Sequence, residues 1–268
     1  MLGVAAGRAA AGRQITRAAV GPADPGGTRP PANITAVCGR YTLTDPAQLR
    51  LRFALVETTD TRIKPRFNVA PSQGVPIVVQ TERGRELRAA GWGFQPVWVR
   101  GDPRKPPPIN ARAETAATSG LFRAALERRR CLIPADGFYE WRAVPGHARR
   151  LPLRFRLKDG ALFAFAGLFT GPRDLQVEDA TCTILTTGPN ELVAPAHNRM
   201  PVILRPEDEA LWLDPAVRDP VAALACCRLY PAELMACDDV DPAVGSPLKD
   251  GPELVAPRPP PRPTASAR

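Results

Sequence analysis

The alternation of apolar and polar positions predicts short strands and short helices in irregular order. Apolar runs bounded by turn residues predict strands at Val75–Gln80, Glu86–Ala90, Leu132–Trp141, Leu153–Leu157, Leu162–Phe169 and Thr181–Thr186. A turn at Arg83-Gly84 would join the first two strands. Because strands predominate and do not alternate regularly with helices, the pattern favours an α+β fold over a doubly wound sheet.

Helical periodicity is found in four short segments. Pro46–Leu55 follows Asp45, a favourable N-cap, and Ser119–Arg130 places its apolar side chains on one face. Pro206–Leu213 opens with acidic residues, which suit the positive end of a helix dipole. Val221–Cys226 completes the set of predicted helices.

The two ends of the chain lack a lasting hydrophobic period. Residues 1–36 are rich in Ala, Gly, Arg and Pro and contain no apolar run of the kind found in a secretory signal. We interpret them as a disordered leader or as a stretch upstream of the true translation start. Residues 256–268 form a Pro/Arg-rich tail that we expect to be disordered. The activity is therefore expected in a single domain at residues 37–255.

Composition excludes several classes of protein. The 32 prolines among 268 residues argue against a helical bundle, and no apolar run is long enough to span a membrane. The net charge is +9, but residues 1–36 hold four arginines and one acid, and residues 256–268 hold three arginines and none. The basic balance alone is thus weak evidence for a nucleic-acid partner.

Cysteine and histidine usage limits the possible chemistry. The six cysteines form no C-x-x-C pair, so we expect reduced thiols and neither a metal site nor a cofactor. His147 lies in a predicted turn and is expected to be solvent-exposed. His197 precedes an apolar run and is the one candidate for imidazole chemistry near neutral pH, although a structural role fits it as well.

Other polar residues have two possible interpretations. Glu140 is flanked by aromatic residues, and strand alternation allows its side chain to face either the interior or water. Asn110 and Arg112 would suit a substrate oxygen and a phosphate, or would simply begin a helix. Trp92 and Trp98 would stack on unpaired bases or pack in the core.

Six fragments occur in order along the chain, namely Cys38-Gly39-Arg40-Tyr41, Arg66-Phe67-Asn68-Val69-Ala70-Pro71, Trp92-Gly93, Ile109-Asn110-Ala111-Arg112-Ala113-Glu114, Gly137-Phe138-Tyr139-Glu140-Trp141 and His197-Asn198-Arg199-Met200-Pro201. Together they resemble the SOS response-associated peptidase family, the abasic-site processing proteins. The resemblance covers roughly residues 38 to 215. The resemblance implies an α+β fold with a curved, barrel-like, mostly antiparallel sheet flanked by helices.

The resemblance also implies an unusual reaction. In the family, the Cys of Cys-Gly-Arg is the mature N-terminal residue, and it crosslinks to an abasic site in single-stranded DNA through a thiazolidine ring. Autocatalytic peptidase activity would expose this residue. By position, Cys38 would be the nucleophile. The implied partner is single-stranded DNA that contains an abasic site. The resemblance further implies a monomer that acts in the bacterial cytoplasm as part of the DNA damage response.

The resemblance assigns roles to matching positions. Asn110 would orient the opened sugar, Glu140 would move protons, and His197 would protonate the sugar ring oxygen. The residues expected to contact phosphates or neighbouring bases, or to lie in the same pocket, are Arg40, Asn68, Pro71, Arg112, Trp141, Thr186 and Arg199.

One feature departs from the family pattern, because Cys38 is preceded by Val37 and 36 other residues rather than by Met alone. An acylated nitrogen at Cys38 is an amide and forms no imine. Three explanations are open: translation from position 37, since GUG-type valine codons serve as bacterial starts; removal of a longer leader by self-processing; or loss of the activity. The patternless composition of residues 1–36 favours the first explanation.

Two other functions are compatible with these residues. A peptidase or amidohydrolase acting without DNA would pair Cys38 or Cys131 with His197. A non-covalent protein would bind single-stranded DNA through arginines and tryptophans, and salt would reverse that binding.

Overall fold

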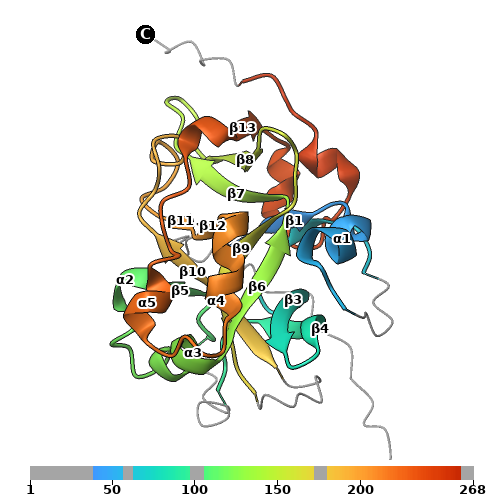
Figure 1. The fold of residues 1–268 in the computed structure, drawn as a ribbon. Coiled ribbons are helices and arrows are strands. Elements are labelled where there is room, and N and C mark those ends of the chain that lie inside the picture. Colours follow the sequence, from blue (N-terminus) through green and yellow to red (C-terminus); the bar gives the residue numbers. More distant parts are fainter. Residues whose placement is uncertain (1–38, 57–62, 97–105, 172–179, 261–268) are drawn as a thin grey trace, which may run out of the picture. The chain divides into compact units, whose positions relative to one another are not determined.

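The computed structural model describes residues 39–56, 63–96, 106–171 and 180–260. Within these segments the strands form two sheets, one of five strands and one of eight (Figure 1). The five-stranded sheet has the order β13-β8-β7-β1-β2, and its neighbours are antiparallel. Its strands are β13 (Met235–Asp239), β8 (Leu151–Leu157), β7 (Gly137–Arg142), β1 (Tyr41–Leu43) and β2 (Arg66–Val69).

The eight-stranded sheet closes on itself. Strands β10, β4, β3, β6 and β9 follow one another by pairing, and β9 pairs back to β10. This closure makes the sheet barrel-like, as the sequence resemblance implied. Its strands are β3 (Gly74–Thr81), β4 (Gly84–Trp92), β5 (Asn110–Arg112), β6 (Arg130–Ala135), β9 (Phe163–Phe169), β10 (Thr181–Thr187), β11 (Met200–Pro201) and β12 (Ile203–Leu204).

Short helices flank this sheet, and α4 packs across β6 (Figure 1). The α-helices are α1 (Leu49–Phe53), α2 (Ala113–Ala116), α3 (Arg123–Arg128), α4 (Glu209–Leu213) and α5 (Pro220–Leu224). The 3-10 turns are η1 (Pro46–Gln48), η4 (Pro206–Asp208), η5 (Ala232–Leu234), η6 (Pro242–Gly245) and η7 (Pro252–Val255). The α+β fold class predicted from the sequence is confirmed.

Strand β6 is buried on both faces, which explains its continuous apolar sequence. Cys131 and Ile133 belong to a core cluster shared with the five-stranded sheet. Leu132, on the opposite face, belongs to a second cluster together with residues of α1, α3, α4 and α5. The domain is therefore layered, with the eight-stranded sheet between the five-stranded sheet and the helices.

The single strand predicted at Leu132–Trp141 is wrong, because two strands of different sheets occupy it. The chain changes sheet at Asp136, whose carboxylate accepts hydrogen bonds from Thr42 Oγ1, from the Thr44 hydroxyl at 2.7 Å and from Arg154 Nη2 at 3.0 Å. These partners come from distant segments, so hydrophobic periodicity does not reveal the break.

The helix predicted at Ser119–Arg130 is shorter in the structure, where α3 spans Arg123–Arg128. Arg130 instead begins β6, and its buried guanidinium donates to the backbone carbonyls of Trp212, Leu126 and Asp214. The sequence interpretation that placed Arg130 at a helix end is corrected by these contacts. The helices predicted near Asp45 and at Pro206–Leu213 are confirmed, and the Asp45 side chain accepts from the Ala47 N–H at 3.2 Å.

Several short strands went unpredicted, namely β1, β2, β5, β11, β12 and β13. Each spans five residues or fewer, which is too short for a periodic signal. Four of them, β1, β2, β5 and β11, carry or adjoin sequence motifs singled out above.

Candidate functional site

The first motif runs into β1, which pairs with the strand that carries Glu140. Tyr41 lies opposite Phe138, and the Tyr139 N–H donates to the Arg40 carbonyl at 3.0 Å. Extending this antiparallel register by two residues places Gly39 opposite Glu140. Cys38, the residue before Gly39, lies outside the described residues.

The Glu140 side chain faces the interior, which decides between the two interpretations of the sequence. Its exposed fraction is 3%, and strand alternation places it on the same face of β7 as Phe138, which belongs to the core cluster shared by the two sheets. Trp141, the next residue, is half-buried and packs against a small cluster that includes Val240 and Leu254. A buried carboxyl group beside the first motif is suited to proton transfer.

Two short strands, β5 and β11, bring two other motifs to Thr186 in β10. Strand β5 runs parallel to β10 and places Arg112 opposite Thr186. Strand β11 pairs with β10 so that Pro201 also lies opposite Thr186. Asn110 in β5 is half-buried and pairs with Ile184, whereas the Arg112 side chain is exposed. The Thr186 side chain is itself buried.

Two contacts connect the first motif with Asn110. A β-carbon built on Gly39 would lie 3.9 Å from Ile109 Cδ1, and Ile109 directly precedes Asn110. The Tyr41 ring packs edge-on against Trp92 at 5.3 Å between centroids, and the Trp92 indole N–H donates to the Ile109 carbonyl at 3.0 Å. Trp92 is a core residue in this arrangement, so its use as an exposed stacking platform is corrected. Trp98 lies outside the described residues.

Arg150 joins the segment of Glu140 to the segment of His197. Its Nε donates to the Trp141 carbonyl at 2.7 Å, and its Nη2 donates to the Ala196 carbonyl at 2.8 Å. Arg150 belongs to none of the six motifs. Because Arg149 is an identical neighbour, no sequence pattern distinguishes Arg150 as the residue that makes this bridge.

His197 is half-buried and held at two points. Its backbone N–H donates to the Val193 carbonyl at 3.0 Å, and its Nδ1 accepts from the Arg199 backbone N–H at 3.1 Å. Burial lowers the pKa of His197, and the positive charges of Arg150 and Arg199 lower it further. The imidazole is therefore neutral at pH 7. Because Nδ1 accepts, the ring proton of the neutral form lies on Nε2.

The Arg199 side chain contacts protein groups on two elements. Its guanidinium forms a two-point ion pair with Glu114 in α2, and it donates to the Thr186 carbonyl at 2.6 Å and to the Thr186 hydroxyl at 3.1 Å. The ion pair lowers the pKa of Glu114 through the hydrogen bonds from Arg199. A phosphate contact by Arg199 stays a prediction.

Arg40 and Asn68 engage the C-terminal part of the domain. Arg40 Nη1 donates to Asn68 Oδ1 at 3.0 Å and to the Val244 carbonyl at 2.8 Å. The Asn68 amide is fully buried and donates to three carbonyl groups, those of Val244, Ser246 and Lys249. Burial lowers the pKa of Arg40. Pro71 is half-buried in the turn after β2. Roles for these residues in DNA binding stay predictions.

Comparison with known proteins decides the family. A family model described as SOS response associated peptidase matches residues 37–247. The chain belongs to the SOS response associated peptidase family.

Two relatives agree with this assignment, and a solved structure shares the fold. Abasic site processing protein YoqW of Bacillus subtilis (strain 168) is 37% identical over 222 residues, which cover 82% of this chain and 99% of that protein. Abasic site processing protein YedK of Escherichia coli (strain K12) is 30% identical and covers 72% of this chain and 84% of its own length. A crystal structure of a Bacteroides thetaiotaomicron protein shares the fold, with a TM-score of 0.70 at 24% identity over 82% of this chain and 100% of that one.

The thiols of this SOS response associated peptidase differ in exposure. Cys131 and Cys182 are fully buried, and burial raises the pKa of both thiols. A buried, protonated Cys131 is a poor nucleophile, which argues against the alternative that pairs it with His197. Cys237, in contrast, is exposed.

One further expectation for the peptidase is corrected by the structure. His147 is half-buried in the turn between β7 and β8, not fully exposed as predicted. Within the described segments, no group of three or more His, Cys, Asp or Glu side chains is placed to share a metal ion. No described helix has the length and apolar character of a membrane span.

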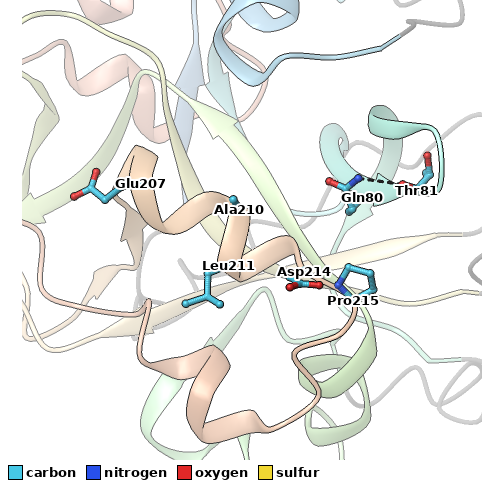
Figure 2. A pocket seen from close by; sticks show the side chains of 7 residues that line it. All are labelled: Gln80, Thr81, Glu207, Ala210, Leu211, Asp214 and Pro215. Atoms are coloured by element: carbon cyan, nitrogen blue, oxygen red, sulfur yellow. Dashed lines mark hydrogen bonds between the residues drawn. The ribbon is translucent and has the colours of Figure 1, made fainter.

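A pocket of about 630 Å³ lies away from these motifs, between the β3–β4 hairpin and α4 (Figure 2). It is lined by Gln80, Thr81, Glu207, Ala210, Leu211, Asp214 and Pro215. None of the residues predicted for the site lines it, so this pocket is distinct from the candidate site of the peptidase.

Proposed function

We propose that this protein processes abasic sites in single-stranded DNA by forming a covalent crosslink through Cys38 as the N-terminal residue. The relatives reported above are named abasic site processing proteins. The observation that carries the proposal is that strand pairing brings motifs from distant parts of the chain together. Strand β1 lies beside the strand of Glu140, and β5 and β11 both pair with β10, which brings together the motifs of Asn110 and His197.

The proposed reaction joins one carbon of the lesion to two atoms of Cys38. The α-amine attacks the aldehyde carbon of the opened abasic sugar, and loss of water gives an imine. The thiol then adds to the same carbon, and its proton passes to the nitrogen, which closes a five-membered thiazolidine ring. Because the thiol belongs to the same residue, this trapping step has the advantage of an intramolecular reaction.

An N-terminal amine suits this chemistry better than a lysine. An α-amine has a pKa of about 7.7–8.0, so about a third of it is neutral at pH 7.5, whereas only about 0.1% of a lysine amine is neutral. The neutral fraction of an N-terminal amine, which is the form that attacks an aldehyde, is therefore roughly a few hundred times larger than that of a lysine amine.

Three side chains serve this reaction. Glu140, buried next to the first motif, accepts the proton of the attacking amine and returns protons as water leaves. Asn110 hydrogen-bonds the opened sugar. The protonated fraction of His197 transfers its Nε2 proton to the sugar ring oxygen while the C1 hydroxyl loses its proton to water, so that the closed sugar opens to the reactive aldehyde and the imidazole regains a proton from solvent.

DNA lies across the surface near the end of β5 in this proposal. Arg112 is exposed there and holds a phosphate of the strand. The remaining predicted contacts shape the site or meet bases next to the lesion, and they come from Arg40, Asn68, Pro71, Trp141, Thr186 and Arg199. The protein works as a monomer and associates with the nucleoid only through DNA.

Exposure of Cys38 has two routes in this proposal. Translation from position 37 leaves only an initiator residue to remove. Otherwise the protein hydrolyses its own Val37–Cys38 bond, and water supplies the new carboxylate and amine. Mass spectrometry of the N-terminus of the protein purified from its native host distinguishes these routes from a chain that retains residue 1.

The test compares the full chain before and after a cleavage that makes Cys38 the N-terminal residue. A protease recognition site is inserted directly before Cys38 in the full chain, so that cleavage releases the N-terminal cysteine. After cleavage we expect an adduct with abasic single-stranded DNA that survives boiling in denaturant. Intact and duplex DNA should give none. Cys38→Ala should abolish the adduct, and Glu140→Gln should slow its formation by about 100-fold while leaving DNA binding unchanged.

The outcomes separate the alternatives. If the cleaved protein forms no heat-stable adduct, or if Cys38→Ala forms the same one, the crosslinking function is wrong. Hydrolysis of peptides in trans without DNA would instead indicate a general peptidase. Binding of intact strands that high salt fully reverses would indicate a non-covalent DNA-binding protein.

A further inference from the structure

Glu114 is placed by the strand that carries Asn110. It lies in the first turn of α2, which follows β5 directly. Its side chain is 51% exposed, yet both carboxylate oxygens accept hydrogen bonds from Arg199, each at 2.8 Å. Such two-point pairing fixes the orientation of the guanidinium, which an ordinary surface ion pair does not.

Arg199 is held from a second side by β10. Its Nη2 also donates to the carbonyl and the hydroxyl of Thr186, a residue with an exposed fraction of 1%. The Arg199 side chain is itself only 15% exposed. The guanidinium of Arg199 is therefore held between α2 and the buried strand β10. This leaves the backbone of Arg199 little freedom to move.

The backbone of Arg199 is the part that reaches the imidazole. Its N–H donates to His197 Nδ1 at 3.1 Å, so the neutral ring carries its proton on Nε2. We propose that Glu114 is a positioning residue, which clamps the Arg199 side chain so that the Arg199 N–H sets the tautomer and orientation of His197. This inference rests on the proposed function only for the role of His197 as a proton donor to the sugar.

The charge of Glu114 acts on His197 as well. The cations facing the imidazole are Arg150 and Arg199, and both lower the pKa of His197 in addition to its burial. The Glu114 carboxylate offsets the charge of Arg199. Its removal should therefore lower the pKa of His197 further, whereas a purely steric role of Glu114 would leave that pKa unchanged.

The test compares Glu114→Gln with Glu114→Asp, which keeps the carboxylate. Glu127→Gln is the matched control, because Glu127 forms an exposed ion pair with Arg123 on α3 and belongs to none of the six motifs. Each variant is released with Cys38 at its N-terminus. We measure the single-turnover rate of adduct formation on abasic single-stranded DNA, the affinity for intact single-stranded DNA, and the melting temperature.

Nitrogen-15 NMR of the imidazoles provides a readout that does not depend on DNA. The chain holds only two histidines, so a His147→Asn background assigns the signals. Wild-type His197 should show the Nε2–H tautomer. Glu114→Gln should show a mixture of tautomers, a titration midpoint at lower pH, and a reaction slowed by about tenfold, which corresponds to about 1.4 kcal/mol of lost transition-state stabilisation. Glu114→Asp should retain the wild-type tautomer and most of the rate, and Glu127→Gln should match the wild type.

Two results would overturn the positioning role. One is a Glu114→Gln variant with an unchanged His197 tautomer and an unchanged rate. The other is a variant that binds intact DNA more tightly and reacts faster, since Glu114 would then block Arg199 from a phosphate. If the wild type forms no adduct, the proposed function fails, but the NMR comparison still decides whether Glu114 orients His197.

Discussion

The environment of His197 lowers the pKa of its imidazole on balance, although a hydrogen bond with the Arg199 backbone acts in the opposite direction. Burial lowers the pKa of its imidazole, and Arg150 and Arg199 add two positive charges that oppose protonation. The sequence showed a histidine before an apolar run, but neither cation is recognisable as its neighbour from the sequence alone. The lowered pKa of the ring and the placement of its proton on Nε2 are products of the tertiary structure.

We predict that His197 titrates below its ordinary pKa of 6.5 in NMR experiments. Arg150→Gln should raise the midpoint, because it removes a positive charge. Arg150→Lys keeps the positive charge but loses the paired hydrogen bonds to the Trp141 and Ala196 carbonyls. It should leave the titration midpoint of His197 close to that of the wild type. A midpoint that Arg150→Gln does not raise would contradict the electrostatic account.

The same shift has a consequence for stability. Since the folded protein holds His197 at a lower pKa than the unfolded chain does, the unfolded chain binds the proton more readily. The contribution of His197 to stability is therefore present above pH 6.5 and is lost as the pH falls through the folded pKa. His197→Gln should flatten this part of the dependence of unfolding free energy on pH.

At the scale of elements, the break between β6 and β7 decides where Glu140 points. Gly137 follows Asp136 at this break, and the chain passes there from the eight-stranded to the five-stranded sheet. A β-carbon at Gly137 would lie 2.7 Å from Arg154 Nε and 2.9 Å from Thr42 Oγ1. Glycine therefore allows the close approach on which the crossing depends.

We predict that Gly137→Ala lowers the free energy of unfolding by about 1–3 kcal/mol, because the added methyl group overpacks a buried hydrogen-bonded network. Denaturant unfolding measures the change. Gly120→Ala is the matched control, since a β-carbon added at Gly120 would meet no described atom within 4 Å, and it should be nearly neutral. Equal effects of the two substitutions would refute this account of the crossing.

At the scale of the whole molecule, the residues after the family match complete the domain. Asp250 accepts from the backbone N–H groups of Phe67 at 2.6 Å and Asn68 at 2.8 Å, and Leu254 in η7 is fully buried. Figure 1 shows this C-terminal stretch (red) beside β1 and α1. The fold thus uses its last described residues to hold β2, and through Asn68 it also holds Arg40.

We predict that a chain ending after residue 247 melts at least about 3 °C below the full chain, because burial of Leu254 alone contributes roughly 1.5–3 kcal/mol. A chain ending after residue 260 should melt like the full protein. Differential scanning calorimetry of the two truncations checks both outcomes. An unchanged melting temperature after removal of residues 248–268 would show that Asp250 and Leu254 do not stabilise the domain.

The α+β class, most of the longer strands and the family motifs follow from the amino-acid sequence, because these depend on local periodicity and on residue identity along a continuous stretch. The burial of Glu140, the bridge that Arg150 forms between two motifs and the ion pair of Glu114 with Arg199 follow only from the folded chain. Each of these depends on pairing between segments far apart in the chain, and very short strands such as β1, β5 and β11 are formed by that pairing rather than by their own sequence pattern.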